Sequence, residues 1–162
     1  MDNSWAEDGE STGAAPRARA RSSFVTRAGI VFFALTVATP VLLLLLFRVV
    51  PPPLTTVMLG AHLVGEPVNQ RWVPLEDISP NLVRAVIGSE DGKFCSHSGF
   101  DWDAINDALD SNASGSRLRG GSTISQQTAK NLFLTLDRTW LRKGMEAYLT
   151  VLLEGLWPKR RI

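Results

Sequence analysis

The stretch IGSEDGKFCSHSGFDW places two carboxylates side by side, Glu90 and Asp91, and a histidine, His97, shortly after them. A carboxylate held beside other polar groups can act as a general base and take the proton of an attacking hydroxyl. An acidic pair at a solvated helix end has the same sequence pattern. The local pattern therefore leaves both interpretations open, and the elements that position the two acids must decide between them.

A helix is expected to carry Glu90 at its C-terminal end. Ser79 suits an N-cap and Pro80 suits the first helical position. Four apolar residues follow at helical spacing: Leu82, Val83, Val86 and Ile87. At the C-terminal end an ionised carboxylate meets the negative end of the helix dipole, which raises its free energy. A purely structural acid would be better placed at the other end, so the position favours a functional role.

Two further helices are expected to follow the acidic pair. Asp101 would cap the first, whose buried stripe is Trp102, Ile105, Ala108 and Leu109. The second starts at Ser122 or Thr123 in STISQQTAKNLFL, because both residue types suit an N-cap. The run SNASGSRLRGGS between them is rich in turn-forming residues and is expected to be mobile.

A last helix is expected from about Trp140 to Trp157. Its apolar stripe would consist of Leu141, Met145, Tyr148, Leu149, Leu152 and Leu156. Upstream of all these helices, an extended stretch or short strand is expected near 68–73. The part of the chain after residue 51 is therefore predicted to be mainly α-helical.

The N-terminal third of the chain is predicted to be a tail and a membrane anchor. Residues 1–27 are polar and are expected to be disordered in the cytoplasm. Residues 28–50 are predicted to be a transmembrane signal anchor, because Ala28 to Phe47 carries no charge and is about the 20 residues that cross a bilayer core. A buried core helix would show a polar face, and a cleaved signal peptide would show a small-x-small site.

The charge distribution sets the expected topology. Four arginines precede the apolar segment: Arg17, Arg19, Arg21 and Arg27. The positive-inside rule then places residues 51–162 on the far side of a bacterial inner membrane, in the periplasm, as a single-pass protein. Residues 51–69 would form a linker and the start of the domain, and residues 70–162 the domain itself.

Composition excludes several classes. With 17 Lys and Arg against 16 Asp and Glu, the net charge of +1 argues against a nucleic-acid partner bound by bulk electrostatics. The single cysteine excludes an intrachain disulfide, and two histidines are too few for a confident zinc cluster.

Three motifs then occur in order: EDGKFCSHSG at 90–99, GGSTISQQTAKN at 120–131 and RKGME at 142–146. With them the chain resembles the membrane-anchored monofunctional peptidoglycan glycosyltransferases of glycosyltransferase family 51, which share their catalytic domain with class A penicillin-binding proteins. The resemblance implies a mainly α, lysozyme-like glycosyltransferase domain. The family continues through a fourth motif, of which the chain holds only Lys159 to Ile162, so a domain incomplete at its C-terminus is expected.

The resemblance also implies a reaction in cell wall biogenesis, which maintains cell shape. The 4-hydroxyl of lipid II would attack the anomeric carbon of a glycan held on a polyprenyl pyrophosphate, which leaves with inversion. Glu90 would be the general base and Glu146 the second catalytic carboxylate. Lys130 and Arg138 would neutralise the departing pyrophosphate, a task for which the planar fork of arginine is well suited.

Further residues are implied to support these four. Binding of sugar or phosphate oxygens would fall to Ser122, Gln126, Gln127, Arg142 and Lys143. Support of the loop would fall to Asp91, Phe94, His97 and Gly99. Structural alternatives are helix capping and surface amides for the serine and glutamines, core packing for Phe94, an ion pair with Asp137 or a solvated loop position for Arg138, and a helical ion-pair set for RKGME.

The remaining predictions concern a metal ion, binding partners and two rival functions. The resemblance implies a divalent cation, Mg²⁺ or Mn²⁺, near the pyrophosphate, and no organic cofactor. It implies lipid II, the polyprenyl-linked glycan, the membrane and other cell wall synthesis proteins as partners. Two rival functions are a non-catalytic protein that binds lipid II or a partner, and a lysozyme-like hydrolase, against which the pair of cations argues.

Overall fold

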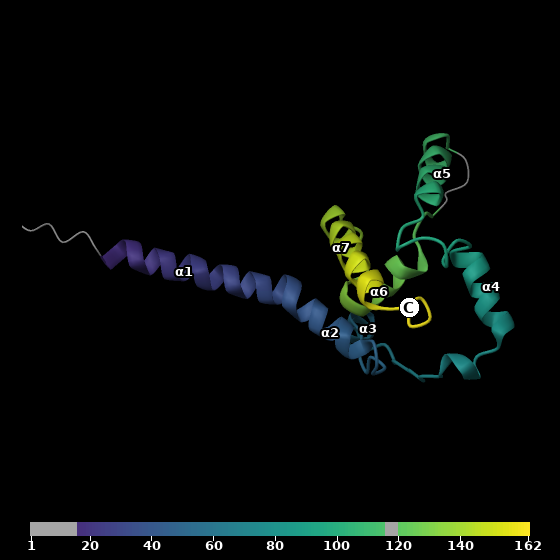
Figure 1. Ribbon diagram of the computed structural model, residues 1–162, viewed down its shortest axis with the longest axis horizontal. Coiled ribbons are helices and arrows are strands. Elements are labelled where there is room, and N and C mark those ends of the chain that lie inside the picture. Colours follow the sequence, from purple (N-terminus) through teal and green to yellow (C-terminus); the bar gives the residue numbers. More distant parts are fainter. Residues whose placement is uncertain (1–15, 116–119) are drawn as a thin grey trace, which may run out of the picture. The chain divides into compact units, whose positions relative to one another are not determined.

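The computed structural model describes residues 16–115 and 120–162, and every regular element in that part of the chain is a helix (Figure 1). The prediction of a mainly α-helical protein is therefore confirmed. Two compact units are distinguished, Met1–Thr39 and Pro40–Ile162, and each is described by itself.

The first unit contains α1 (Pro16–Phe33) and a π-helical turn, Ala34–Ala38. Residues 16–27 are helical, which differs from the disordered tail expected there, and the rest of that tail lies outside the described residues. A proline at the first helical position and a following run of alanine and arginine favour helix over coil. The apolar segment that is long enough to cross a membrane is Phe24–Phe47, so it begins before the expected Ala28.

The second unit contains most of the helices. They are α2 (Thr39–Phe47), α3 (Thr56–Leu63), α4 (Pro80–Glu90), α5 (Trp102–Ala113), α6 (Ile124–Phe133) and α7 (Trp140–Leu156), with a 3₁₀ turn at Leu75–Asp77. Helices α4 to α7 confirm the four expected helices. Helix α3 was not expected; Thr55 caps it by accepting a hydrogen bond from the Met58 N–H at 3.2 Å. Residues 68–73 are irregular and not a strand.

The core of the second unit joins the end of the apolar segment to the end of the chain. Its buried residues are Leu44, Phe47, Leu153 and Trp157. Partly buried apolar side chains surround them: Leu43, Leu132, Phe133, Leu152, Leu156 and Ile162. Helices α6 and α7 pack side by side over this core (Figure 1).

Two expected buried stripes are wrong in part. In α5 the buried member is Ala108, while Trp102 and Leu109 are 67% and 62% exposed. In α7 the buried residues are Glu146, Leu149, Thr150 and Leu153, while Leu141 is 80% exposed. The buried face of α7 includes polar groups. The Thr150 hydroxyl donates to the Glu146 carbonyl, and the Glu146 carboxylate pairs with Arg142 and Lys143, so both residues can be buried without large cost.

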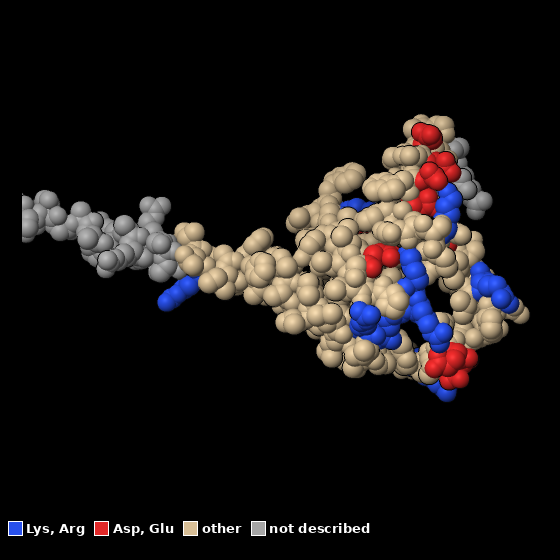
Figure 2. All heavy atoms as spheres, in the orientation of Figure 1, with Lys and Arg blue, Asp and Glu red and all other residues tan. Residues whose placement is uncertain are grey.

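Charged side chains are distributed unevenly along the chain. In Figure 2 the apolar helix is drawn almost entirely in tan, whereas blue and red side chains gather over the second unit. The residues with candidate chemistry all belong to this second unit.

Candidate active site

Glu90 is the last residue of α4, and its side chain is exposed to solvent. Its Oε2 accepts a hydrogen bond from the Gln127 Nε2 at 3.0 Å. Gln127 belongs to α6, so the bond joins the first and second motifs directly. Among the described residues no other group donates to this carboxylate, which leaves Oε1 open to a ligand. Glu90 also lines a hollow of about 210 Å³, together with Asp101, Asp107 and Ser122.

Asp91, the neighbouring acid, has the opposite environment. It is buried and receives the Ile124 N–H on Oδ2 at 3.0 Å and the His97 Nε2 on both oxygens, at 2.9 and 3.0 Å. His97 Nδ1 in turn accepts the Gly99 N–H at 3.1 Å. This pattern assigns the imidazole proton to Nε2. Asp91 therefore fixes the turn after Glu90 to the start of α6 and is positioned for structural support.

Thr123 secures the start of α6 from the other side. Its hydroxyl accepts the Gln126 N–H, and the Gln126 side chain accepts the Thr123 N–H at 3.0 Å, which completes a capping box. The same hydroxyl donates to the Gly99 carbonyl at 2.6 Å. Gln126 is buried and engaged in this cap, the structural use that its position in the sequence also allowed. Its role in substrate binding stays a prediction that this geometry does not favour.

Gly99 closes the loop with a backbone conformation that disfavours other residues. Its φ is +95°, and a Cβ placed there would lie 2.9 Å from Thr150 Cγ2 and 3.0 Å from Glu154 Cγ. Gly99→Ala would combine left-handed strain with a clash against α7, and we expect a loss of about 2–4 kcal/mol of unfolding free energy. Thermal unfolding in detergent, followed by circular dichroism, measures this. Gly92→Ala is the matched control, since its Cβ would meet nothing within 4 Å; equal losses would contradict the assignment.

The third motif forms a buried ion cluster on α7. Glu146 is buried; its Oε2 accepts from Arg142 Nη1 at 2.6 Å and its Oε1 from Lys143 Nζ. Lys143 also reaches Ser122 Oγ at 3.4 Å, so the second and third motifs meet here. The helical ion-pair set weighed for RKGME is present in a partly buried form, because Glu146 is buried while the Lys143 side chain is 42% exposed. Arg142 Nε is buried and finds no acceptor among the described residues, which leaves a donor unsatisfied.

Glu146→Gln should disturb this cluster, because one amide oxygen cannot replace two carboxylate oxygens. We expect a loss of about 1–3 kcal/mol of unfolding free energy, the usual cost of leaving one buried hydrogen-bonding group without its partner. Thermal unfolding provides the measurement, with the exposed Glu66→Gln as its control. A melting temperature unchanged in Glu146→Gln would show that the cluster contributes nothing to stability.

The two expected leaving-group cations lie apart from these ion pairs. Lys130 is half-buried in the last turn of α6, three residues after Gln127 and therefore on a neighbouring position of the helix. Arg138 is exposed. Asp137, its possible ion-pair partner, instead accepts from Thr135 at 2.9 Å. No hydrogen bond or ion pair from the described residues engages either cation, so both are available to an anion.

Phe94 lies in the protein interior, where core packing was the alternative to ligand contact. It is 6% exposed and packs edge-on to His97, with ring centroids 6.3 Å apart. Lys159 lies 4.6 Å from its ring centroid and pairs with Glu154 at 2.7 Å. Glu154 also accepts from Ser125 of α6. Sequence reasoning missed this link between α6, α7 and the end of the chain; the acid and lysine five residues apart were the available signal.

An exposed ion pair ties the first motif to α5. Lys93 Nζ lies 2.6 Å from Asp103 Oδ2. The hydrogen bond raises the pKa of Lys93 above its usual value and lowers the pKa of Asp103 below its own. The depressed carboxyl pKa contributes stability that is lost as the pH falls through it, and the raised lysine pKa contributes stability that is lost at high pH. The pair is therefore formed across the neutral range.

The described side chains offer few ligands for the expected divalent cation. In the described residues no group of three or more His, Cys, Asp or Glu side chains could hold a metal. Both oxygens of Glu146, the acid considered for this task, accept from cationic side chains. The residues there do not fit a metal ion.

Comparison with known proteins identifies the family. Residues 57–162 match the family model described as Transglycosylase. The chain belongs to the transglycosylase family. The family match and the helices confirm the expected fold class, mainly α with a lysozyme-like transglycosylase domain.

Curated members of the transglycosylase family with the name "Biosynthetic peptidoglycan transglycosylase" are close in sequence. The protein of Rhodospirillum centenum is 57% identical over 117 residues, which are 72% of this chain and 51% of the relative. That of Caulobacter vibrioides is 50% identical over 130 residues, 80% of this chain and 57% of the relative. The chain thus spans little more than half the length of these relatives.

Proposed function

We propose that this transglycosylase-family chain polymerises lipid II into β-1,4-linked glycan strands with release of polyprenyl pyrophosphate. The observation that carries the proposal is the contrast between the two adjacent acids. Asp91 is buried with its oxygens engaged, whereas Glu90 is exposed on a hollow and held by Gln127 alone. An oriented carboxylate with a free oxygen meets the geometric requirement for a general base.

In the proposed reaction the sugar hydroxyl approaches from the hollow. Its oxygen forms a bond to the anomeric carbon of the polyprenyl-linked glycan while its proton passes to Glu90. The bond from that carbon to the pyrophosphate breaks, and its electron pair leaves with the pyrophosphate. Ser122 and Gln127, which lie beside Glu90, would bind sugar oxygens.

Negative charge grows on the pyrophosphate during this step, so cations must face it. We assign that task to Lys130 and Arg138, which have no acidic partner among the described residues. Arg142 and Lys143 share Glu146, so their cluster keeps one net positive charge. A phosphate oxygen beside Arg142 would also satisfy its unpaired Nε.

The proposed location follows from the apolar segment. Among the described residues Phe24–Phe47 is long and apolar enough to cross a membrane. We propose a single-pass anchor in the bacterial inner membrane, with the N-terminus in the cytoplasm and the catalytic unit in the periplasm. Other cell wall synthesis proteins would meet the chain there.

The test is polymerisation of lipid II by the purified full chain in proteoliposomes and in detergent. We expect glycan polymer and released polyprenyl pyrophosphate. Binding of lipid II without polymer would contradict catalysis and support the non-catalytic alternative. Release of soluble fragments from purified sacculi would instead support the hydrolase.

A further inference from the structure

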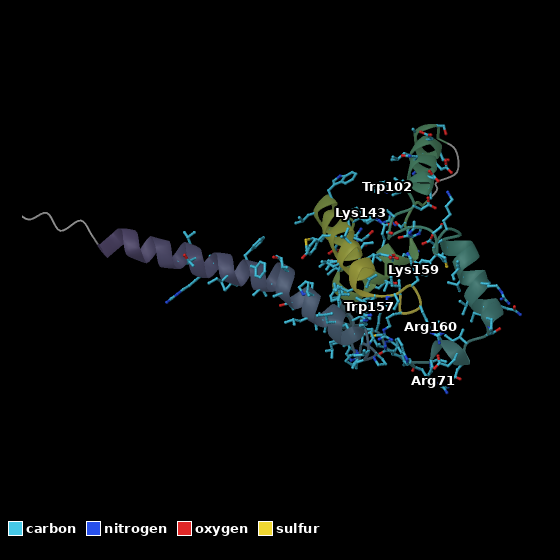
Figure 3. The ribbon with its side chains drawn as sticks, in the orientation of Figure 1. Arg71, Trp102, Lys143, Trp157, Lys159 and Arg160 are labelled. Carbon is cyan, nitrogen blue, oxygen red and sulfur yellow. The ribbon has the colours of Figure 1, made fainter. Side chains whose placement is uncertain are left out.

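Residues near the C-terminal end of the chain hold the end of the apolar segment by its backbone carbonyls. Trp157 Nε1 donates to the Leu44 carbonyl at 2.7 Å. Arg161 Nε donates to the Phe47 carbonyl at 2.8 Å, and its Nη2 donates to the same carbonyl and to that of Val50 at 2.9 Å. These bonds connect parts of the sequence more than 100 residues apart. Figure 3 labels Trp157 where α7 ends beside α2.

A guanidinium is well suited to this position. The last carbonyls of a helix lack partners within the helix, and the helix dipole makes that end negative. Arg161 supplies several donors and a positive charge at once. It lies near two aromatic rings, with its Cζ 5.1 Å from the Trp72 ring centroid and 5.3 Å from that of Trp157. Burial lowers the pKa of Arg161 from its usual value, but an arginine stays charged at neutral pH.

Apolar packing acts together with these bonds. Leu44 and Leu153 are fully buried, and Phe47 and Trp157 are nearly so. The last turns of the apolar segment thus belong to the core of the second unit and are not a loose tether. A chain that needed only attachment would not require hydrogen bonds from Trp157 and Arg161 to its anchor.

We propose that Trp157 and Arg161 are positioning residues that clamp the end of the membrane anchor onto the catalytic unit and thereby hold the Glu90 site at a set height above the bilayer. A lipid-linked sugar is presented at a height fixed by its own membrane anchor, so a fixed site meets it more often than a swivelling one. The orientation benefit rests on the proposed function, whereas the clamp itself does not.

The clamp is tested by the width of the distribution of one distance, that between spin labels at positions 42 and 95. Cys95 is exposed and is the single cysteine of the chain, so a nitroxide can be placed there and a second at Leu42→Cys, a position 65% exposed. Double electron–electron resonance on the full chain in proteoliposomes should give one narrow distance distribution. In the Trp157→Phe/Arg161→Gln variant we expect a clearly broader one.

Matched controls come from the same stretch of chain. Trp140 is 93% exposed, and the Arg160 side chain is 73% exposed and pairs with Glu76. Trp140→Phe/Arg160→Gln should keep the narrow distribution. A distribution that stays narrow in the clamp variant would overturn the proposal. If the double variant does not fold, Trp157→Phe alone decides by the same measure, because it keeps an aromatic side chain at this position and removes the donor to Leu44.

A second readout separates positioning from general stability. In proteoliposomes we expect the clamp variant to polymerise lipid II about tenfold more slowly, because a site misplaced by about 1 Å can lose up to roughly 10²-fold in rate. In detergent micelles, where the substrate height is not fixed, its rate should match that of the unaltered chain. Equal losses in both media would indicate a purely structural role. An unaltered chain that is inactive in both media would refute the proposed function, while the distance distributions would still decide the clamp.

Discussion

Glu90→Gln is expected to reduce lipid II polymerisation by about 10²–10⁴-fold, the usual contribution of a general base. The amide has nearly the same shape as the carboxylate, and its oxygen can still accept from Gln127 Nε2, which reaches Glu90 at 3.0 Å. It cannot take a proton from a sugar hydroxyl at neutral pH. Polymer formed from lipid II in detergent, separated by gel electrophoresis, gives the measurement.

Two controls make the result specific to the base. Because Glu90 is exposed, Glu90→Gln should leave the melting temperature and lipid II binding unchanged. Glu66→Gln, an exposed acid outside the site, should leave the polymerisation rate unchanged as well. If Glu90→Gln polymerises at the rate of Glu66→Gln, the proton is taken by another group and the assignment of Glu90 is wrong.

The sequence predicted the elements that follow local rules. Pro80 marked the first turn of α4, although the Ser79 side chain makes no capping hydrogen bond. Thr123 marked the start of α6, and an uncharged run marked the apolar segment. These features depend on residues close together in the chain, where capping and hydrophobic periodicity act. Helix α3 was not predicted, because the glycines and prolines near it favoured irregular structure, although Thr55 caps the helix.

Contacts between residues far apart in the sequence could not be predicted from these local rules. The apolar face predicted for α7 was displaced because Glu146 and Thr150 are buried with partners on the same helix, and the face that a helix buries depends on what packs against it. For the same reason the Gln127 bond to Glu90 and the Arg161 bonds to the apolar segment could not be read from spacing. The motif resemblance named residues that the structure brings into contact, such as Glu90 with Gln127 and Ser122 with Lys143, but it did not say which would be engaged with each other.

Asp91→Asn is expected to cost about 1–3 kcal/mol of unfolding free energy, although the two side chains have nearly the same size. Asp91 accepts N–H groups from both Ile124 and His97, and an amide has only one oxygen for them. If the new amide turned its NH₂ group toward His97, this group and the His97 Nε2–H would be two donors facing each other. The imidazole cannot escape by moving its proton to Nδ1, because that atom accepts the Gly99 N–H. One buried donor must lose its partner.

The measurement is thermal unfolding in detergent, where we expect the melting temperature to fall by roughly 3–10 °C. Asp110→Asn, an exposed acid on α5, serves as the matched control and should unfold as the unaltered chain does. The conflict between these donors also predicts that the stability losses of Asp91→Asn and His97→Ala are not additive. His97→Ala removes the opposing donor, so Asp91→Asn should cost less in that background than alone. Additive losses would show that His97 and Asp91 stabilise the turn independently, and that the hydrogen-bond chain from Gly99 to Ile124 does not act as one unit.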